Sequence, residues 1–272
     1  MENARLRRIF DVLGRLATDG PQTVTEMSNA LSLPMSSTHD LLKAMVKGGM
    51  ASVTTHGYDV GPATLRLSLR VQERLNIVNA ATVELQKLAA RIGFDVYLAI
   101  QTGNDVVYAA RFRGRRGIKI DIPIGLPLYR HATAVGKLLA AYDLEFRQET
   151  FSGNLKALTP RTHIDRQSLT EELDRIRSNG FSISREEAVL GIVGIATPIW
   201  ANGRIVGIAH ISALRSEVND DRLAELAVEL QRTSAVIEEQ ILGLRSADAR
   251  PLQIIDHIGP PIYDGAYTPQ FR

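Results

Sequence analysis

The chain has 272 residues, which predicts about two domains, and its 44% hydrophobic content is that of an ordinary globular protein. It contains no cysteine, which excludes disulfides, thiolate metal sites and cysteine nucleophiles. The net charge of +2 argues against indiscriminate nucleic-acid binding but leaves room for a local basic face. No apolar run approaches the ~20 residues of a membrane span, and MENARLRRIF lacks a signal-peptide core, so we expect a cytoplasmic protein.

The first predicted element is an amphipathic helix over residues 2–18, which Asp19-Gly20-Pro21 ends. Its periodicity predicts an inward face made of Leu6, Ile9, Phe10, Leu13 and Leu16.

Residues 23–49 predict two short helices joined by a tight turn at Pro34. The first covers 24–31 with Val24, Met27 and Leu31 on one face. The second begins at Ser36 or Ser37 and turns Leu41, Leu42, Met45 and Val46 inward. Hydroxyls at its start are expected to cap the helix and to reach phosphates. The pattern is typical of a DNA recognition helix, and the alternative is an ordinary pair of helices in a bundle.

Two short extended runs follow, over 50–53 and 58–60, and predict the hairpin of a winged helix-turn-helix. Asp40, on the predicted recognition helix, would repel phosphate. A solvated surface position is the alternative role for each charged candidate. The candidate DNA contacts are Arg5, Arg8, Thr25, Ser36, Ser37, Thr38, His39, Lys43 and His56.

After Gly61-Pro62, a helix carrying Arg66, Arg70 and Arg74 on one face predicts a rigid connector. The remainder predicts an α+β domain, with helices over 78–92, 133–142, 165–178 and 220–242. Extended runs cover 94–101, 106–112, 118–124, 192–200 and 205–212, with hairpins at 102–105 and at Asn202-Gly203. The predicted boundaries are therefore 1–61, 62–77, 78–246 and 247–272. The last segment, rich in Pro and Gly, either docks on a partner or is disordered.

Several segments resemble the IclR family of bacterial transcriptional regulators, over about residues 5–245. They are the run from Thr23 to Ser37 with its T-x-x-E-[LM]-x-x-x-L-x-L-P-x-S-[ST] form, HATAVGK (131–137), LTPRTHID (158–165), Glu187 to Gly191, and the paired strands around Asn202-Gly203. The resemblance implies a winged helix-turn-helix, a linker helix and a GAF-like effector-binding domain with an antiparallel sheet. It also implies a homodimer or tetramer that binds double-stranded DNA at a palindromic operator, with recognition helices ~34 Å apart.

HATAVGK lies at the start of a predicted helix, where free N–H groups and small side chains suit a carboxylate ligand. Tight helix–sheet packing is the alternative role for these small residues. With Thr133 at the helix start, the resemblance implies an effector site of Leu128, Ala134, Val135, Ser184, Gly194, His210 and Ser212, with Ile120 a weaker candidate on the same wall. Many relatives carry a cysteine at position 194 and an acidic residue at 184, so we expect a roomier and less acidic site here.

His210 is either a satisfied core residue or a contact for a ligand carboxylate or phenol, and Arg130 is either a counter-ion or points outward. These features predict a small organic acid effector, aromatic rather than a short keto acid. The predicted function is a ligand-responsive regulator of catabolic genes, a repressor rather than an activator. One alternative is a ligand-independent DNA-binding dimer whose second domain only oligomerises.

A second alternative is a hydrolase that uses His210, Ser212 and Ser184. However, the sequence has no nucleophile elbow, metal cluster or P-loop. We therefore expect neither enzymatic activity nor a metal or cofactor.

Overall fold

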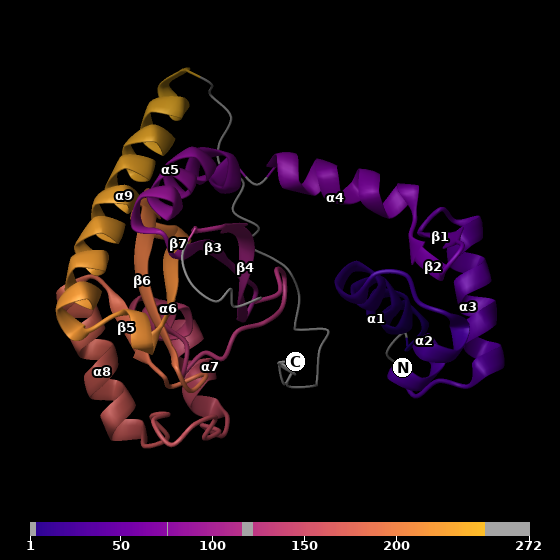
Figure 1. Ribbon diagram of the computed structural model, residues 1–272, viewed down its shortest axis with the longest axis horizontal. Coiled ribbons are helices and arrows are strands. Elements are labelled where there is room, and N and C mark those ends of the chain that lie inside the picture. The colour runs from indigo at the N-terminus through magenta and orange to yellow at the C-terminus, as the bar shows by residue number, and fades with distance from the viewer. Residues whose placement is uncertain (1–3, 75, 116–121, 248–272) are drawn as a thin grey trace. The chain divides into compact units, whose positions relative to one another are not determined.

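The computed structural model describes residues 4–74, 76–115 and 122–247, with side chains over 6–71, 77–115 and 122–243. The chain divides into two compact units, 1–75 and 76–272 (Figure 1). The predictions for Ile120, for the side chain of Arg5 and for the tail after residue 247 lie outside the described residues. Within the described ranges, no helix is both long and apolar enough to cross a membrane.

The first unit is a three-helix core with a small hairpin and a following helix. Its elements are α1 (Ala4–Asp19), α2 (Val24–Ala30), α3 (Met35–Lys47), β1 (Ala51–Thr54), β2 (Gly57–Val60) and α4 (Pro62–Arg74). β1 and β2 pair antiparallel, and an isolated bridge joins Gln22 to Tyr58. The core gathers Val12, Leu16, Met27, Leu42 and Met45. The predicted helix-turn-helix and hairpin are both present.

The predicted inward face of α1 is only partly correct. Leu16 is buried with Val12, whereas Leu6 and Phe10 are 53% and 54% exposed. At about 100° per residue, Leu6 and Phe10 lie on the flank of the stripe that contains Val12 and Leu16. The apolar residues of this helix span both the buried stripe and its exposed flank, so their spacing alone did not distinguish the two.

The start of α3 also differs from the prediction. Pro34 occupies the N-cap and no side chain caps the helix, so neither Ser36 nor Ser37 has that role. Thr38 is fully buried, and its hydroxyl donates to the Pro34 carbonyl oxygen at 3.1 Å. Side-chain capping occurs at α2 instead, where Thr23 and Glu26 form a capping box.

The second unit is an antiparallel five-stranded sheet with helices on both faces. Its elements are α5 (Asn76–Ile92), β3 (Asp95–Thr102), β4 (Asp105–Phe112), α6 (Ala134–Tyr142), α7 (Leu144–Ser152), α8 (Arg166–Asn179), β5 (Ser182–Arg185), β6 (Ile192–Ala201), β7 (Arg204–Leu214), η1 (Arg215–Glu217) and α9 (Asp220–Ala247). The strand order is β4-β3-β7-β6-β5.

Alternate residues of the strands face opposite layers of helices. Thr197 on β6 shares a 2.8 Å hydrogen bond with Ser234 of α9, and α9 also packs against α5. The neighbouring residue, Ala196, belongs to a buried cluster with Ala134 and Val135 of α6. Figure 1 shows α9 and α6 on different sides of the central strands. This alternation decides which side chains meet the start of α6.

Most predicted elements of this unit are present. Asp165 caps α8, Gly180 ends it in the left-handed region, and Asn202 and Gly203 form the β6–β7 turn with φ of 52° and 72°. The extended run over 118–124 is wrong for residues 122–124, which lie in no strand, and 118–121 lie outside the described residues. Three short elements, α7, β5 and η1, were not predicted.

Candidate functional site

A row of small residues crosses three strands of the second unit. Ser184 on β5 pairs with Gly194 on β6, and Gly194 pairs with Ser212 on β7. A Cβ built on Gly194 would lie 3.6 Å from the Cβ of Ala134, the first residue of α6. The register therefore brings four predicted effector-site residues together beneath the start of one helix.

The hydroxyls in this region differ in how they are bonded. Ser184 Oγ donates to the Ala132 carbonyl oxygen at 2.7 Å, which ties β5 to the segment before α6. Ser212 Oγ and Ser182 Oγ are the only buried side-chain polar atoms without a hydrogen-bond partner in the described part of the chain. A buried hydroxyl left unsatisfied costs about 1–3 kcal/mol. The Ser212 hydroxyl in this row is therefore able to form a hydrogen bond with a ligand or a water molecule.

The start of α6 has the geometry of an anion site but uses its own hydroxyl internally. Thr133 Oγ1 accepts from the Gly136 amide at 3.0 Å and donates to the Tyr129 carbonyl oxygen at 2.7 Å. The partial positive charge of the helix terminus remains near Ala134. Val135 is fully buried in the core cluster, and Leu128 packs against that cluster from its edge.

His210 occupies the space expected to be free above Gly194. Its Nε2 lies 2.7 Å from the position of a Cβ on Gly194, so the expectation of a roomier site is wrong at this point. Its Nδ1 lies 3.1 Å from the Tyr108 hydroxyl, and the ring packs against Tyr97 and Tyr108. Burial lowers the pKa of His210 to about 3 and raises that of Tyr108, so both groups are neutral at physiological pH. His210 therefore has a hydrogen-bond partner at Nδ1, while its Nε2 faces the row of small residues.

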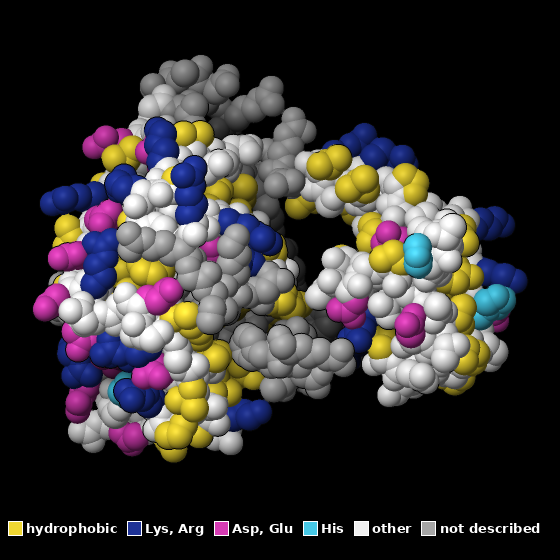
Figure 2. All heavy atoms as spheres, in the orientation of Figure 1, with side chains coloured by type: hydrophobic (Ala, Val, Ile, Leu, Met, Phe, Trp, Pro, Cys, Tyr) yellow, Lys and Arg dark blue, Asp and Glu magenta, His cyan; other side chains and the backbone are white. Residues whose placement is uncertain are grey.

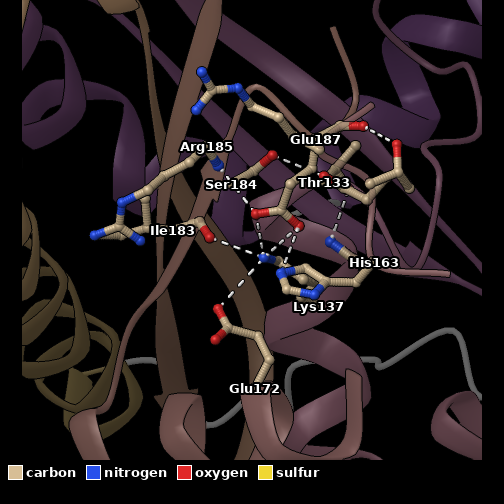
Figure 3. A network of polar contacts seen from close by, with 12 residues as sticks. Thr133, Lys137, His163, Glu172, Ile183, Ser184, Arg185 and Glu187 are labelled. Atoms are coloured by element: carbon tan, nitrogen blue, oxygen red, sulfur yellow. Dashed lines mark hydrogen bonds and ion pairs between the residues drawn. The ribbon is translucent and has the colours of Figure 1, made fainter. Parts of the chain in front are cut away.

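A buried ion pair anchors α6 beside this row (Figure 3). Lys137 is fully buried, and its Nζ contacts both carboxylate oxygens of Glu187 at 2.7 Å and the Ile183 carbonyl oxygen at 2.9 Å. Glu172 of α8 adds a longer contact at 3.4 Å. Burial acts to raise the pKa of Glu172, but Lys137 and Arg175 outweigh it and the net shift is downward. The network joins α6, α8 and the end of β5.

Arg130 is not the free counter-ion considered from the sequence. Its guanidinium pairs with Asp105 at 3.3 Å and with Glu149 at 3.7 Å, and it lies over the Phe146 ring. Two carboxylates already balance its charge.

The predicted DNA contacts lie mostly on the surface of the first unit. Ser36, Ser37 and Lys43 are exposed on α3, and the His39 side chain is 43% exposed. Thr25, Arg8 and His56 are exposed on α2, α1 and the hairpin turn. Figure 2 shows histidine and basic side chains at the surface of this unit. Burial of Thr38 excludes it from direct contact, so its role is structural.

Five residues of the site were not identified from the sequence: Tyr97, Tyr108, Ser182, Lys137 and Glu187. Lys137 and Glu187 do belong to segments that carry the family resemblance, yet nothing in the sequence indicates that they meet. The two tyrosines lie on predicted strands, but their place beside His210 depends on the strand register, which periodicity alone does not give.

Comparisons with known proteins place these features in a family. Residues 69–239 match the family described as "Bacterial transcriptional regulator IclR C-terminal", and residues 6–53 match "IclR helix-turn-helix domain". The chain is 28% identical to the HTH-type transcriptional regulator XynR of Escherichia coli over 87% of this chain and 95% of that protein. It is 27% identical to the E. coli HTH-type transcriptional repressor AllR over 84% and 85% of the two chains.

A solved structure has the same fold. The IclR homologue from Microbacterium hydrocarbonoxydans, crystallised with 4-hydroxybenzoate, matches with a TM-score of 0.78 at 22% identity and covers 88% of this chain and 99% of its own. The matched families and the curated relatives are transcriptional regulators, so this chain is a DNA-binding regulator rather than an enzyme. The two matched segments correspond to the two units of the fold, the helix-turn-helix unit and the sheet unit. The chain therefore belongs to the IclR family of bacterial transcriptional regulators.

Proposed function

We propose that this protein is a repressor of catabolic genes that binds a palindromic operator and responds to a small organic acid. The observation that carries the proposal is the buried, unpartnered hydroxyl of Ser212, which lies in the row beneath the start of α6. A unit that only held two copies together would gain nothing from an unsatisfied hydroxyl at that place. The name of the relative AllR, a repressor, supports the direction of the response.

The proposed effector is an aromatic acid. Free space above Gly194 is not an argument for an aromatic ligand, because His210 fills that space. Support comes instead from the rings of Tyr97, Tyr108 and His210, whose centroids lie 4.5–5.8 Å apart beside the row. The 4-hydroxybenzoate complex of the Microbacterium homologue points to the same class of ligand. The carboxylate would lie at the N-terminus of α6, where the helix dipole favours negative charge.

The proposed DNA-binding form is a homodimer or a pair of dimers. On helices α1 and α4 of the first unit, five large apolar side chains are more than half exposed: Leu6, Phe10, Leu65, Leu67 and Leu69. Apolar surface of this kind on two helices commonly marks a contact with another chain. Two copies would present their α3 helices to successive major grooves, and Ser36, Ser37, His39 and Lys43 would make the contacts. Such a protein acts beside the chromosome, in the bacterial cytoplasm.

The proposed mechanism is thermodynamic linkage. An effector changes operator affinity only if it binds one arrangement of the dimer better than another. Couplings of about 1–3 kcal/mol, which are typical, would change that affinity by roughly 5–150-fold.

Fluorescence anisotropy with the protein's own upstream promoter fragment tests the proposal. We expect salt-sensitive, site-selective binding that 4-hydroxybenzoate or a related aromatic acid weakens. Thermal stabilisation by short keto acids but by no aromatic acid would contradict the effector class. Selective binding that no acid of either class changes would favour the ligand-independent dimer instead. Absence of selective binding would overturn the proposed function as a whole.

A further inference from the structure

Gly194 and His210 fill one volume from adjacent strands. Gly194 pairs with Ser212 and His210 pairs with Ala196, and the Ile195–Ile211 pair lies between them. The two residues are therefore separated by one residue pair of β6 and β7 and lie on the same face of the sheet. Any side chain at position 194 would meet His210 Nε2 at 2.7 Å. The backbone of Gly194 does not have a positive φ, so its conformation alone does not require glycine. Glycine is needed there because the imidazole takes the space.

The surroundings of His210 fix both its orientation and its proton. The imidazole and the Tyr108 hydroxyl are buried, and 3.1 Å separates Nδ1 from the phenolic oxygen. An unprotonated imidazole nitrogen is a better acceptor than a phenolic oxygen, so the favoured bond has Tyr108 donating to Nδ1. The ring proton then lies on Nε2, the nitrogen that faces Gly194. Contacts with the Tyr97 and Tyr108 rings hold the imidazole in this position.

We propose that His210 determines the specificity of the effector site, with Nε2–H donating a hydrogen bond to a carboxylate or carbonyl oxygen of the effector. The proposal rests on the proposed function, because it assigns a role within the same site. The unpartnered Ser212 hydroxyl, two residues further along β7 and on the same face, supplies a second neutral hydrogen-bonding group. A fixed Nε2–H cannot accept, so an ammonium or amide N–H at this end of a ligand would leave two donors facing each other. The site thus selects an acceptor oxygen and rejects an amine.

The first test needs no ligand. Nitrogen-15 NMR of histidine-labelled protein is expected to show His210 with a protonated Nε2 and an unprotonated Nδ1 at neutral pH. Tyr108→Phe is expected to disturb that pattern, because the donor to Nδ1 is lost. A protonated Nδ1 in the unmodified protein would overturn the proposal.

The second test is a cycle of unfolding measurements with Gly194→Ala, His210→Ala and the double variant. Gly194→Ala alone is expected to destabilise the second unit, since the new methyl overlaps the imidazole. In the double variant, Gly194→Ala is expected to lose most of this penalty. Equal effects of Gly194→Ala in both backgrounds would show that the two residues do not share space, and would overturn the proposal.

The third test compares His210→Phe, which keeps the ring but lacks the donor, with His210→Asn, which keeps an N–H. The probes are 4-hydroxybenzoate, pyruvate and 4-aminomethylphenol, with fluorescence of the single tryptophan, Trp200, and calorimetry as readouts. An acid that binds the unmodified protein is expected to bind His210→Phe at least tenfold more weakly, as loss of a hydrogen bond to a charged group implies. His210→Asn is expected to recover part of the loss. The control is Leu144→Ala, at a 70% exposed position on α7.

The binding measurements distinguish an incorrect effector class from an incorrect role of His210. If neither acid binds the unmodified protein, the effector class under the proposed function fails, and the assigned role of His210 fails with it. If an acid binds and His210→Phe binds it equally well, only the role of His210 fails. Tighter binding of 4-aminomethylphenol than of 4-hydroxybenzoate would also overturn that role.

Discussion

Lys137 and Glu187, fifty residues apart in the chain, meet in a buried ion pair in which both carboxylate oxygens lie 2.7 Å from the ammonium nitrogen. Lys137 ends the HATAVGK segment, and Glu187 begins the segment that runs to Gly191. The Arg185 amide also donates to Glu187 at 3.0 Å, so the carboxylate has a second donor. Two segments that carry the family resemblance thus form one structural unit beside the effector site.

Lys137→Met is expected to lower the free energy of unfolding of the second unit by about 3–5 kcal/mol, because Glu187 would stay buried without its partner. Chemical denaturation followed by circular dichroism measures the change. The control is Arg175→Ala. Arg175 pairs with Glu172, which also contacts Lys137, but the Arg175 side chain is 59% exposed, so its loss should cost less than about 1 kcal/mol. Lys137→Met/Glu187→Leu should recover much of the loss. A single variant as stable as the unmodified protein would show that the pair carries little net energy.

The stability of the second unit is expected to fall on mild acidification because of His210. Its folded-state pKa is lowered to about 3 by burial, whereas the unfolded chain binds the proton near pH 6.5. Between these values the unfolded state holds more protons, so the free energy of unfolding decreases as pH falls, by up to about 1.4 kcal/mol per pH unit. Burial also lowers the pKa of His131, which acts in the same direction.

Denaturation of the unmodified protein and of His210→Asn at about pH 7 and about pH 5 isolates this contribution, since carboxylates titrate mainly below that range. The variant should show a slope smaller by close to one proton. Identical slopes would mean that His210 titrates alike in both states.

Lys43→Gln is expected to weaken promoter binding across all sequences rather than at one base pair. Lys43 is exposed on α3, and the loss of one phosphate contact should reduce the slope of log affinity against log salt by about 1. Anisotropy titrations at several salt concentrations measure this slope. Lys87→Gln, on α5 of the other unit, is the matched control and should leave it unchanged. An unaltered slope for Lys43→Gln would remove Lys43 from the DNA contacts.

Two glycine substitutions should differ in cost although both positions have positive φ. At Gly203 a new Cβ would meet no atom within 4 Å, so alanine should cost only the backbone strain, about 1 kcal/mol. At Gly57, with φ of 123°, it would lie 2.5 Å from the Gln22 carbonyl oxygen and disturb the bridge to Tyr58.

Gly57→Ala should therefore destabilise the first unit more than Gly203→Ala destabilises the second, and it should also weaken promoter binding. Calorimetric scans of the two variants provide the comparison. Equal penalties would show that the hairpin shifts away from Gln22 at little cost.

The sequence was sufficient for the elements whose signals are local. Asp165 and Gly180 mark the two ends of α8, and Asn202-Gly203 marks the β6–β7 turn, because capping and turn chemistry depend on a few adjacent residues. The four-residue strand β5 gave no such signal, since its hydrogen bonds come from β6. Pairing with a distant strand decides whether so short a segment becomes extended.

The site was predictable as a set of positions but not as an arrangement. Ser184, Gly194, His210 and Ser212 were all named, yet the space expected above Gly194 is filled by His210. The small size of Gly194 on one strand compensates for the large side chain of His210 on the next. This compensation follows from the strand register, which the sequence alone does not give. Similarly, the hydroxyls at the start of α3 suggested a side-chain cap. In the structure Pro34 is the N-cap residue, and the buried Thr38 hydroxyl bonds to the Pro34 carbonyl oxygen instead of capping the helix.

The shared volume of Gly194 and His210 constrains how related regulators could change their metabolite. If residue 194 became larger first, its side chain would clash with His210. If residue 210 became smaller first, the change would leave only a cavity. Partial collapse makes a void the more tolerable defect. Exchange of one signal molecule for another is therefore expected to begin at position 210, through an ancestor with relaxed selectivity, and to be completed later at position 194.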